Sequence, residues 1–227
     1  MNSQARPVHS NQTGPHEDLA KVVQRHLTSQ FQKPIQVHNQ AAFAEMDKQV
    51  QAWQGPLILD SCCGVGESTA VIAERNPDAL VIGVDKSAHR LQKHGSYETT
   101  QQGNRYYLVR ADLMDFWRLA EQAMWPVQKH FILYPNPWPK AAHLSRRWHG
   151  SPVWPAVVKL GGQLTLRSNW STYLLEVAEA LSLSDFSAAI THLPATSTEP
   201  MTPFERKYQQ SGQSLWQLQA NLTCPRS

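Results

Sequence analysis

The chain has 227 residues, of which 41% are hydrophobic and 17% charged, and its formal net charge is +3 at pH 7. This length and composition fit one globular domain with a substantial core, and a charge this small does not by itself indicate a nucleic-acid binder. Three cysteines, two of them adjacent, exclude an even disulfide framework and favour a reducing compartment, so we expect a cytoplasmic protein.

The start of the chain has no apolar core of the kind that a signal peptide needs, and we expect none. Residues 1–16 are polar and contain two prolines and a glycine, which predicts a mobile tail. Apolar spacing predicts one helix over residues 17–27 and a second over 41–53. We therefore assign residues 17–227 to a single domain that begins with a helical extension. No apolar run approaches the roughly 20 residues of a membrane-spanning helix, so we expect no membrane anchor.

The centre of the chain alternates between short apolar runs and helix-length patterns. The runs predict strands over residues 56–62, 79–85, 105–112, 129–135 and 163–169. Helices are predicted over residues 65–76, 86–94, 153–160 and 171–182. This alternation predicts an α/β fold with a doubly wound, mostly parallel sheet of the Rossmann-like class. Beyond residue 185 the pattern weakens, and the last strands cannot be placed.

Acidic residues follow three successive predicted strands, where ligands bind in open parallel sheets. The first strand leads through Asp60 into a loop with Gly64 and Gly66, the second ends in Asp85, and the third ends in Asp112. Three acids with no lysine in the glycine loop do not suit a triphosphate. They indicate a cationic adenosine cofactor, S-adenosylmethionine. The alternative is that each aspartate merely caps the helix that follows it.

Two other kinds of site are weaker matches to this loop. A dinucleotide fingerprint needs a third glycine where the chain has Thr69, so a nicotinamide oxidoreductase is only a partial match. Cys62 and Cys63 are too close together for paired zinc ligation, and no Cys-x-x-Cys motif is present. We therefore expect no metal site.

The segment "YPNPWPK" (residues 134–140) leaves the fourth predicted strand with three prolines in five positions. A residue before proline is pushed into extended geometry, so Tyr134, Asn136 and Trp138 predict a stiff extended strip over the cofactor end of the sheet. The amide of Asn136 can both donate and accept a hydrogen bond, which suits a base edge. The ring of Trp138 offers a flat surface on which a base could stack.

A basic run follows this strip. If it is helical, its cations lie three and four residues apart on one face and form a phosphate-binding patch. The cations are Lys140, His143, Arg146 and Arg147. The alternative is a solvated basic loop without a ligand.

The sequence resembles the bacterial tRNA (guanine-N7)-methyltransferases over most of residues 30–220. The resemblance rests on "LDSCCGVGEST", "PNPWPKAAHLSRR", "GGQLTLRSNWSTY" and "TPFERKYQQSGQSLWQL". It implies a class I methyltransferase fold, S-adenosylmethionine as cofactor, and a guanine in the variable loop of tRNA as substrate. By motif, the family's cofactor acids fall on Asp60, Asp85 and Asp112. Its substrate-side residues fall on Lys140, Thr202, Phe204 and Glu205.

Three substrate-side positions depart from the family pattern. The strip normally reads P-D-P-W, but here the acid is Asn136. The family's T-D-W has become S-N-W with Asn169, and T-K-F-E has become T-P-F-E with Pro203. We interpret Asn136 as the position where the substrate base lies. Loss of a carboxylate there would slow methyl transfer on the order of 100- to 1000-fold without abolishing it.

The leading hypothesis is therefore a tRNA guanine-N7 methyltransferase, or a relative with a different RNA target, which acts as a monomer or weak homodimer. A second hypothesis is a protein that binds cofactor and RNA but has lost methyl transfer, because two acids are replaced by amides. A small-molecule methyltransferase would not need the basic run after the strip.

Overall fold

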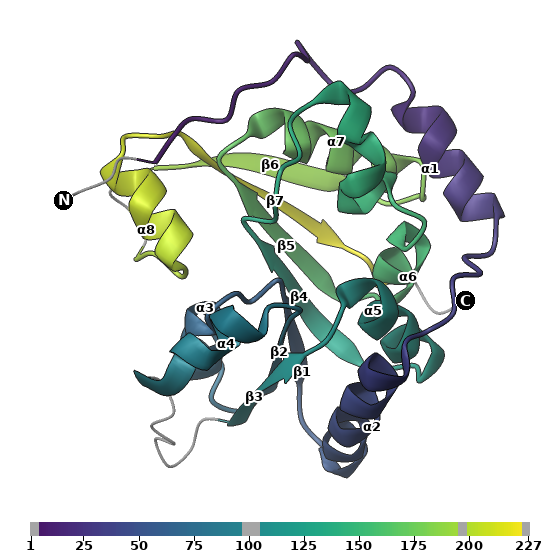
Figure 1. Cartoon of the computed structure of the whole chain (residues 1–227), viewed down its shortest axis with the longest axis vertical. Coiled ribbons are helices and arrows are strands. Elements are labelled where there is room, and N and C mark those ends of the chain that lie inside the picture. Colours follow the sequence, from purple (N-terminus) through teal and green to yellow (C-terminus); the bar gives the residue numbers. More distant parts are fainter. Residues whose placement is uncertain (1–4, 97–104, 195–198, 224–227) are drawn as a thin grey trace.

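The computed structural model describes residues 5–96, 105–194 and 199–223, which fold around one seven-stranded sheet (Figure 1). The strands are β1 (Leu57–Ser61), β2 (Leu80–Asp85), β3 (Arg105–Arg110), β4 (Val127–Leu133), β5 (Gln163–Ser168), β6 (Ala188–Leu193) and β7 (Leu215–Asn221). They lie in the order β3-β2-β1-β4-β5-β7-β6, and β7 alone in this sheet runs antiparallel to its neighbours. The prediction of a doubly wound, mostly parallel sheet is confirmed.

Helices cover both faces of the sheet. They are α1 (Leu19–Thr28), α2 (Val37–Ala52), α3 (Glu67–Arg75), α4 (Ala88–Leu91), α5 (Leu113–Gln122), α6 (Trp154–Lys159), α7 (Ser171–Ser182) and α8 (Pro203–Gln210). Figure 1 shows α3 and α4 on one side of the sheet, with α1, α2, α5, α6 and α7 on the other. The larger apolar core lies under the second group and buries Phe116, Trp117, Trp154 and Tyr173 completely.

Burial explains which strands the sequence reveals. Every residue of β1 and β2 is buried, so both read as continuous apolar runs. The edge strand β6 buries only Leu193 of its six residues, and β7 beside it alternates only loosely. These two strands and helices α5 and α8 were not predicted, whereas the five strands before residue 185 were, to within two residues at either end.

The segment before α1 differs from the predicted mobile tail. Its first four residues lie outside the described part of the chain, but Ser10 Oγ donates to the carbonyl of Pro139 at 2.6 Å, and Gln12 Nε2 donates to Glu176 at 3.0 Å. Polar composition suggests disorder only when the polar groups have no folded partners. Here the partners lie more than 120 residues away along the chain, where composition cannot reveal them.

No helix within the described ranges is long and apolar enough to cross a membrane.

Gly161 and Gly162 lie in the turn from α6 to β5, and both have positive φ, 72° and 75°. The two positions can therefore be compared directly. A Cβ at Gly161 would meet nothing closer than 3.6 Å, but at Gly162 it would lie 2.5 Å from the carbonyl oxygen of Val127. We expect Gly161→Ala to lower the free energy of unfolding by about 1–2 kcal/mol, the cost of left-handed backbone. Gly162→Ala should cost about 1–3 kcal/mol more, because backbone atoms cannot move aside. Urea unfolding of both variants measures the difference, and equal losses would contradict the clash.

Candidate active site

A cavity of about 630 Å³ opens at the carboxyl ends of the parallel strands. One part of its wall comes from the glycine loop after β1 and from the residues that follow β2 and β3. The remainder comes from the strip after β4, the turn that follows it, and the start of α8. A volume of this size suits a drug-sized or nucleoside-sized ligand. Segments separated by more than 100 residues therefore form one site.

The glycine loop forms the floor of the cavity. Gly64 lines it with φ of 62°, and a Cβ at this position would meet nothing within 4 Å, so ligand atoms can approach the backbone. Gly66 does not line the cavity. Its φ is 81°, and a Cβ would lie 2.6 Å from the side chains of His94 and Leu108. Gly66 is thus required for the turn and for packing rather than for direct cofactor contact.

Asp85 and Asp112 both line the cavity, as the strand-end pattern predicts. The carboxylate of Asp85 is held from two sides, because it accepts from the Gly64 amide at 3.1 Å and forms an ion pair with Arg90 at 3.1 Å. Asp112 accepts from the Met114 amide at 2.9 Å and so caps α5. For Asp112 the two interpretations coexist, since the same side chain caps a helix and faces the cavity.

Asp60 lies completely buried behind the cavity wall. Its Oδ2 accepts from the hydroxyls of Ser68 at 2.6 Å and Thr69 at 2.7 Å. Its Oδ1 has no hydrogen-bond partner among the described residues. Burial, with a smaller effect from nearby Asp85, raises the pKa of Asp60 to about 6, although the two hydroxyls oppose this rise. Thr69, which breaks the dinucleotide pattern, therefore serves to hold this carboxylate.

The strip lines the cavity as predicted, but its backbone is not simply extended. Tyr134 and Trp138 both precede proline, yet their φ angles are 51° and 45°. Non-glycine residues in this region are strained by about 1–3 kcal/mol and concentrate at functional sites. Tertiary contacts hold them there: the Tyr134 amide donates to the Arg167 carbonyl at 2.9 Å, and the Trp138 carbonyl accepts from Arg147 Nη2 at 3.1 Å.

The basic run forms a 3-10 helix over Ala141–Arg146 rather than the α-helical patch that was predicted. Lys140 and Arg146 are exposed, and Arg146 lines the cavity whereas Lys140 does not.

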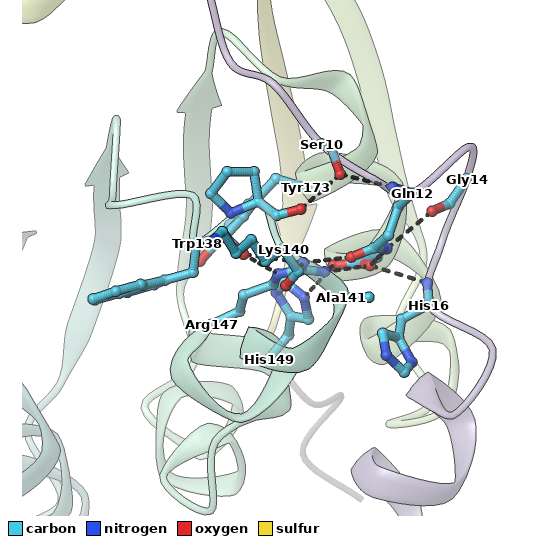
Figure 2. A network of polar contacts seen from close by, with 12 residues as sticks. Ser10, Gln12, Gly14, His16, Trp138, Lys140, Ala141, Arg147, His149 and Tyr173 are labelled. Carbon is cyan, nitrogen blue, oxygen red and sulfur yellow. Dashed lines mark hydrogen bonds and ion pairs between the residues drawn. The ribbon is translucent and has the colours of Figure 1, made fainter.

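Arg147 corrects the prediction of a phosphate contact, because its side chain is completely buried. Its Nη1 contacts both carboxylate oxygens of Glu176 at 2.6 Å, and Figure 2 shows it among Trp138, Lys140 and Gln12. Glu176 was not predicted at all; it is one of two glutamates in a largely apolar helix, and nothing in the sequence distinguishes it from Glu179.

The start of α8 contributes Thr202, Pro203 and Phe204 to the cavity wall, and 48% of Phe204 is exposed. Glu205 differs from the prediction of a substrate contact. It is fully buried and pairs with Arg167 at 2.7 Å, so it orients α8 instead.

Asn169 also lies outside the cavity wall, where its Nδ2 donates to Gln213 at 2.9 Å. The cavity is also lined by three cations that follow β2 and were not predicted as site residues, Lys86, Arg90 and Lys93. These cations come directly after a predicted strand that ends in Asp85, and this position in the sequence could have identified them.

Comparison with known proteins identifies the family. The model of the family described as "Putative methyltransferase" matches residues 54–218. The chain belongs to this methyltransferase family. A tRNA (guanine-N(7)-)-methyltransferase of Treponema pallidum is 27% identical over 170 residues, which cover 72% of this chain and 66% of that protein. One from Neisseria meningitidis serogroup A is 26% identical over 209 residues, 86% of each chain. The chain thus spans slightly less than two thirds of the Treponema relative.

Solved structures support the fold of this methyltransferase. The 16S rRNA (adenine(1408)-N(1))-methyltransferase of Catenulisporales acidiphilia, solved with its cosubstrate SAM, superposes with a TM-score of 0.59 at 16% identity, over 81% of this chain and 92% of that one. The 16S rRNA methyltransferase KamB gives 0.57 at 14% identity, over 83% and 95%. Identities this low speak for the fold alone, and they confirm the class I methyltransferase fold.

S-adenosylmethionine is the cofactor of this family, and the residues present fit it. Asp60 places a carboxylate behind the cavity wall, and its Oδ1 has no partner among the described residues, so its negative charge favours a cationic ligand group in the cavity. Gly64 leaves its backbone open to the cavity, and Asp85 and Asp112 place carboxylates at the ends of the next two strands. The residues fit a nicotinamide cofactor less well. Thr69 occupies the position of the third glycine in the dinucleotide fingerprint, and its hydroxyl donates to Asp60.

Asp60 gives a test that is independent of catalysis. Its folded pKa of about 6 lies above the ordinary 3.8, so ionisation in the cofactor-free protein costs about 3 kcal/mol above pH 6 and nothing below pH 3.8. We expect Asp60→Asn to raise the free energy of urea unfolding by up to that amount at pH 7.5, with less than half of the gain left at pH 4.5. The same variant should bind S-adenosylmethionine roughly 10- to 100-fold less tightly in calorimetry.

The exposed Asp78→Asn is the control for this experiment, and we expect no comparable gain from it. A gain that stays constant from pH 4.5 to 7.5 would show that relief of a buried charge is not the cause.

Proposed function

We propose that this chain is a tRNA (guanine-N7)-methyltransferase that uses S-adenosylmethionine and acts on a guanine in the variable loop. The observation that carries the proposal is that one cavity joins Asp85 and Asp112 to Asn136, Trp138 and the start of α8. A ligand-binding half and a base-binding half therefore share a wall, on the two sides of β1 in the sheet. The names of the Treponema and Neisseria relatives support the same reaction and substrate.

The reaction demands little proton chemistry from the protein. S-adenosylmethionine, when bound, supplies an electrophilic methyl group. Guanine N7 carries an in-plane lone pair, so no side chain must remove a proton before attack. The residues of the cavity instead hold the base and stabilise the positive charge that develops on the purine.

Asn136 is suited to hold the base but not to neutralise that charge. Its Oδ1 accepts from the backbone amide of Trp138 at 3.4 Å, a long contact that favours one orientation of the side chain. The Nδ2 group is then left to donate to a base acceptor such as guanine O6. An aspartate in the same turn would offer a second acceptor with a negative charge.

RNA binding falls to the exposed cations beside the strip. Arg146 lies over the face of Trp138 at 4.8 Å and lines the cavity, while Lys140 is exposed just before the start of the same 3-10 helix. An arginine stacked on an aromatic ring can contact a phosphate with its remaining donors. The chain also places the half-exposed ring of Phe204 at the same opening, where a base could stack.

A second candidate function is a protein that binds cofactor and RNA without methyl transfer. The amides at Asn136 and Asn169, where the family pattern has acids, favour it. Both candidates need the same cavity, so turnover separates them.

The decisive assay measures transfer of labelled methyl to tRNA that lacks N7-methylguanosine, with the modified nucleoside identified by mass spectrometry. We expect N7-methylguanosine from the wild type, and a kcat up to roughly 100-fold higher for Asn136→Asp, because a carboxylate stabilises the charge on the purine. Asn169→Asp should change kcat much less, because Asn169 lies outside the cavity wall. No product from either protein, with S-adenosylmethionine still bound, would favour the second candidate.

Arg146 and Arg147 are adjacent in the chain, but one is exposed and the other buried, so we expect different effects when each is replaced. Arg146→Ala should leave the free energy of unfolding within about 0.5 kcal/mol of wild type. It should weaken tRNA binding and reduce the slope of log K against log salt by about 1, the loss of one phosphate contact. Arg147→Ala should instead destabilise the fold by about 3–5 kcal/mol, because it leaves Glu176 buried without its ion-pair partner. Urea unfolding and salt-dependent binding of both variants check this, and a reversed pattern would contradict the assignment.

A further inference from the structure

The polar segment before α1 contacts residues that flank both parts of the proposed base-binding wall, the strip and α8. At its start, the Ala5 amide donates to Ser211 Oγ at 2.9 Å, and the Ala5 carbonyl accepts from Gln213 Nε2 at 2.9 Å. Ser211 and Gln213 follow α8 directly, whose first turn lines the cavity. Figure 1 shows the segment running from α8 past α7 to α1.

Further along, the same segment contacts the strip. Ser10 Oγ donates to the Pro139 carbonyl at 2.6 Å, and the Ala141 amide donates to Asn11 Oδ1 at 3.0 Å. These are contacts to backbone atoms directly after Trp138. They restrain the path of the strip without depending on its side chains.

Gln12 completes the connection through a buried network (Figure 2). Its Nε2 donates to Glu176 Oε1 at 3.0 Å, and its Oε1 accepts from Arg147 Nη2 at 2.5 Å. Arg147 in turn donates from Nε and Nη2 to the carbonyl of Trp138 at 3.2 and 3.1 Å, and from Nη2 to that of Lys140 at 3.2 Å. One amide side chain therefore contacts both members of the ion pair that holds the strip.

The strip needs such restraint, because Trp138 has a strained φ of 45°. Backbone strain of this kind persists only where contacts with the surrounding structure hold the residue in place. Arg147 supplies two of the contacts to the Trp138 carbonyl, and Gln12 limits where the guanidinium can move.

We propose that residues 5–16 form a strap that positions the base-binding wall, and that Gln12 is the positioning residue that couples this strap to the strip. The proposal rests on the proposed function for its catalytic consequence, but not for its structural one. Gln12 touches neither the cofactor acids nor the cavity wall, so its effect on transfer is exerted through Arg147 and the strip.

The test compares Gln12→Ala with Thr13→Ala in the full-length chain. Thr13 is exposed in the same segment, which makes it a matched control for changing the strap without touching the network. Hydrogen exchange of the peptide over residues 138–147 is the first readout, and it needs no activity. We expect at least about tenfold faster exchange for Gln12→Ala and wild-type exchange for Thr13→Ala, because opening of the strip costs less without Gln12.

The second readout separates positioning from cofactor binding and from fold. For Gln12→Ala, the S-adenosylmethionine dissociation constant should stay within twofold of wild type. The kcat on tRNA should fall about tenfold, with KM within about twofold, because misplacement of the base acts on the transition state. Ser10→Ala, which removes the donor to Pro139, should shift exchange and kcat in the same direction by a smaller factor.

Unchanged exchange over residues 138–147 in Gln12→Ala would overturn the strap, whatever the activity. An equal loss of kcat in Thr13→Ala would overturn the role of Gln12. If the wild type transfers no methyl group, the proposed function fails, but the exchange data still decide whether the strap holds the strip.

Discussion

The buried carboxylate of Glu176 is the group on which the geometry of the strip depends, because it binds Arg147, which in turn holds the Trp138 carbonyl. It lies on α7 and accepts from Arg147, from His149 Nε2 at 2.9 Å, from Gln12, and from the His16 amide at 3.0 Å. Four donors from two segments that are remote in sequence thus converge on one helix. A carboxylate can accept this many hydrogen bonds, whereas an amide or hydroxyl cannot.

The charge state of this cluster follows from its surroundings. Burial by itself raises the pKa of Glu176, but hydrogen bonding from His149, Arg147 and Gln12 outweighs it and lowers the pKa to about 2. Burial also lowers the pKa of His149, so the lasting positive charge is that of Arg147. The stabilisation from ionised Glu176 is present above its ordinary pKa of 4.5 and is lost as the pH falls from 4.5 towards 2. At neutral pH the pair is therefore a permanent ionic contact, and it can hold strained backbone in place.

How much of this could be read from the sequence depends on how local each contact is. The cofactor side is local: Asp60 bonds Thr69 nine residues later, and Gly64 bonds Asp85 after 21 residues, within one strand-loop-helix-strand unit. Apolar runs and glycine spacing reveal such units directly. The edge strand β6 gave no apolar run, because it buries only Leu193. Helix α5 is different, because it buries Leu113, Phe116 and Ala120 at helical spacing, a local pattern that was available and was missed.

The strip and the end of α8 depend on partners that are far apart in the sequence. Ser10 and Pro139 are 129 residues apart, Gln12 and Arg147 are 135 apart, and Ala5 lies 206 residues from Ser211. In the sequence, Arg147 is one more cation in a basic run. Only the distant carboxylate distinguishes it from Arg146, its exposed neighbour. The X-Pro rule likewise describes local preference, and tertiary contacts override it at Tyr134 and Trp138.

This division also explains how the two halves of the site can change separately. Asp60, Asp85 and Gly64 are held by hydrogen bonds within the first two strands and their connections, and none of those contacts involves the strip. Asn136 is exposed, and its one described hydrogen bond goes to the backbone of Trp138, which aspartate would keep. Exchange of acid for amide at this position therefore alters the charge at the cavity wall while the frame around it stays the same. The strained backbone of Trp138 is held by its carbonyl, which accepts from Arg147, and not by the side chain of Asn136.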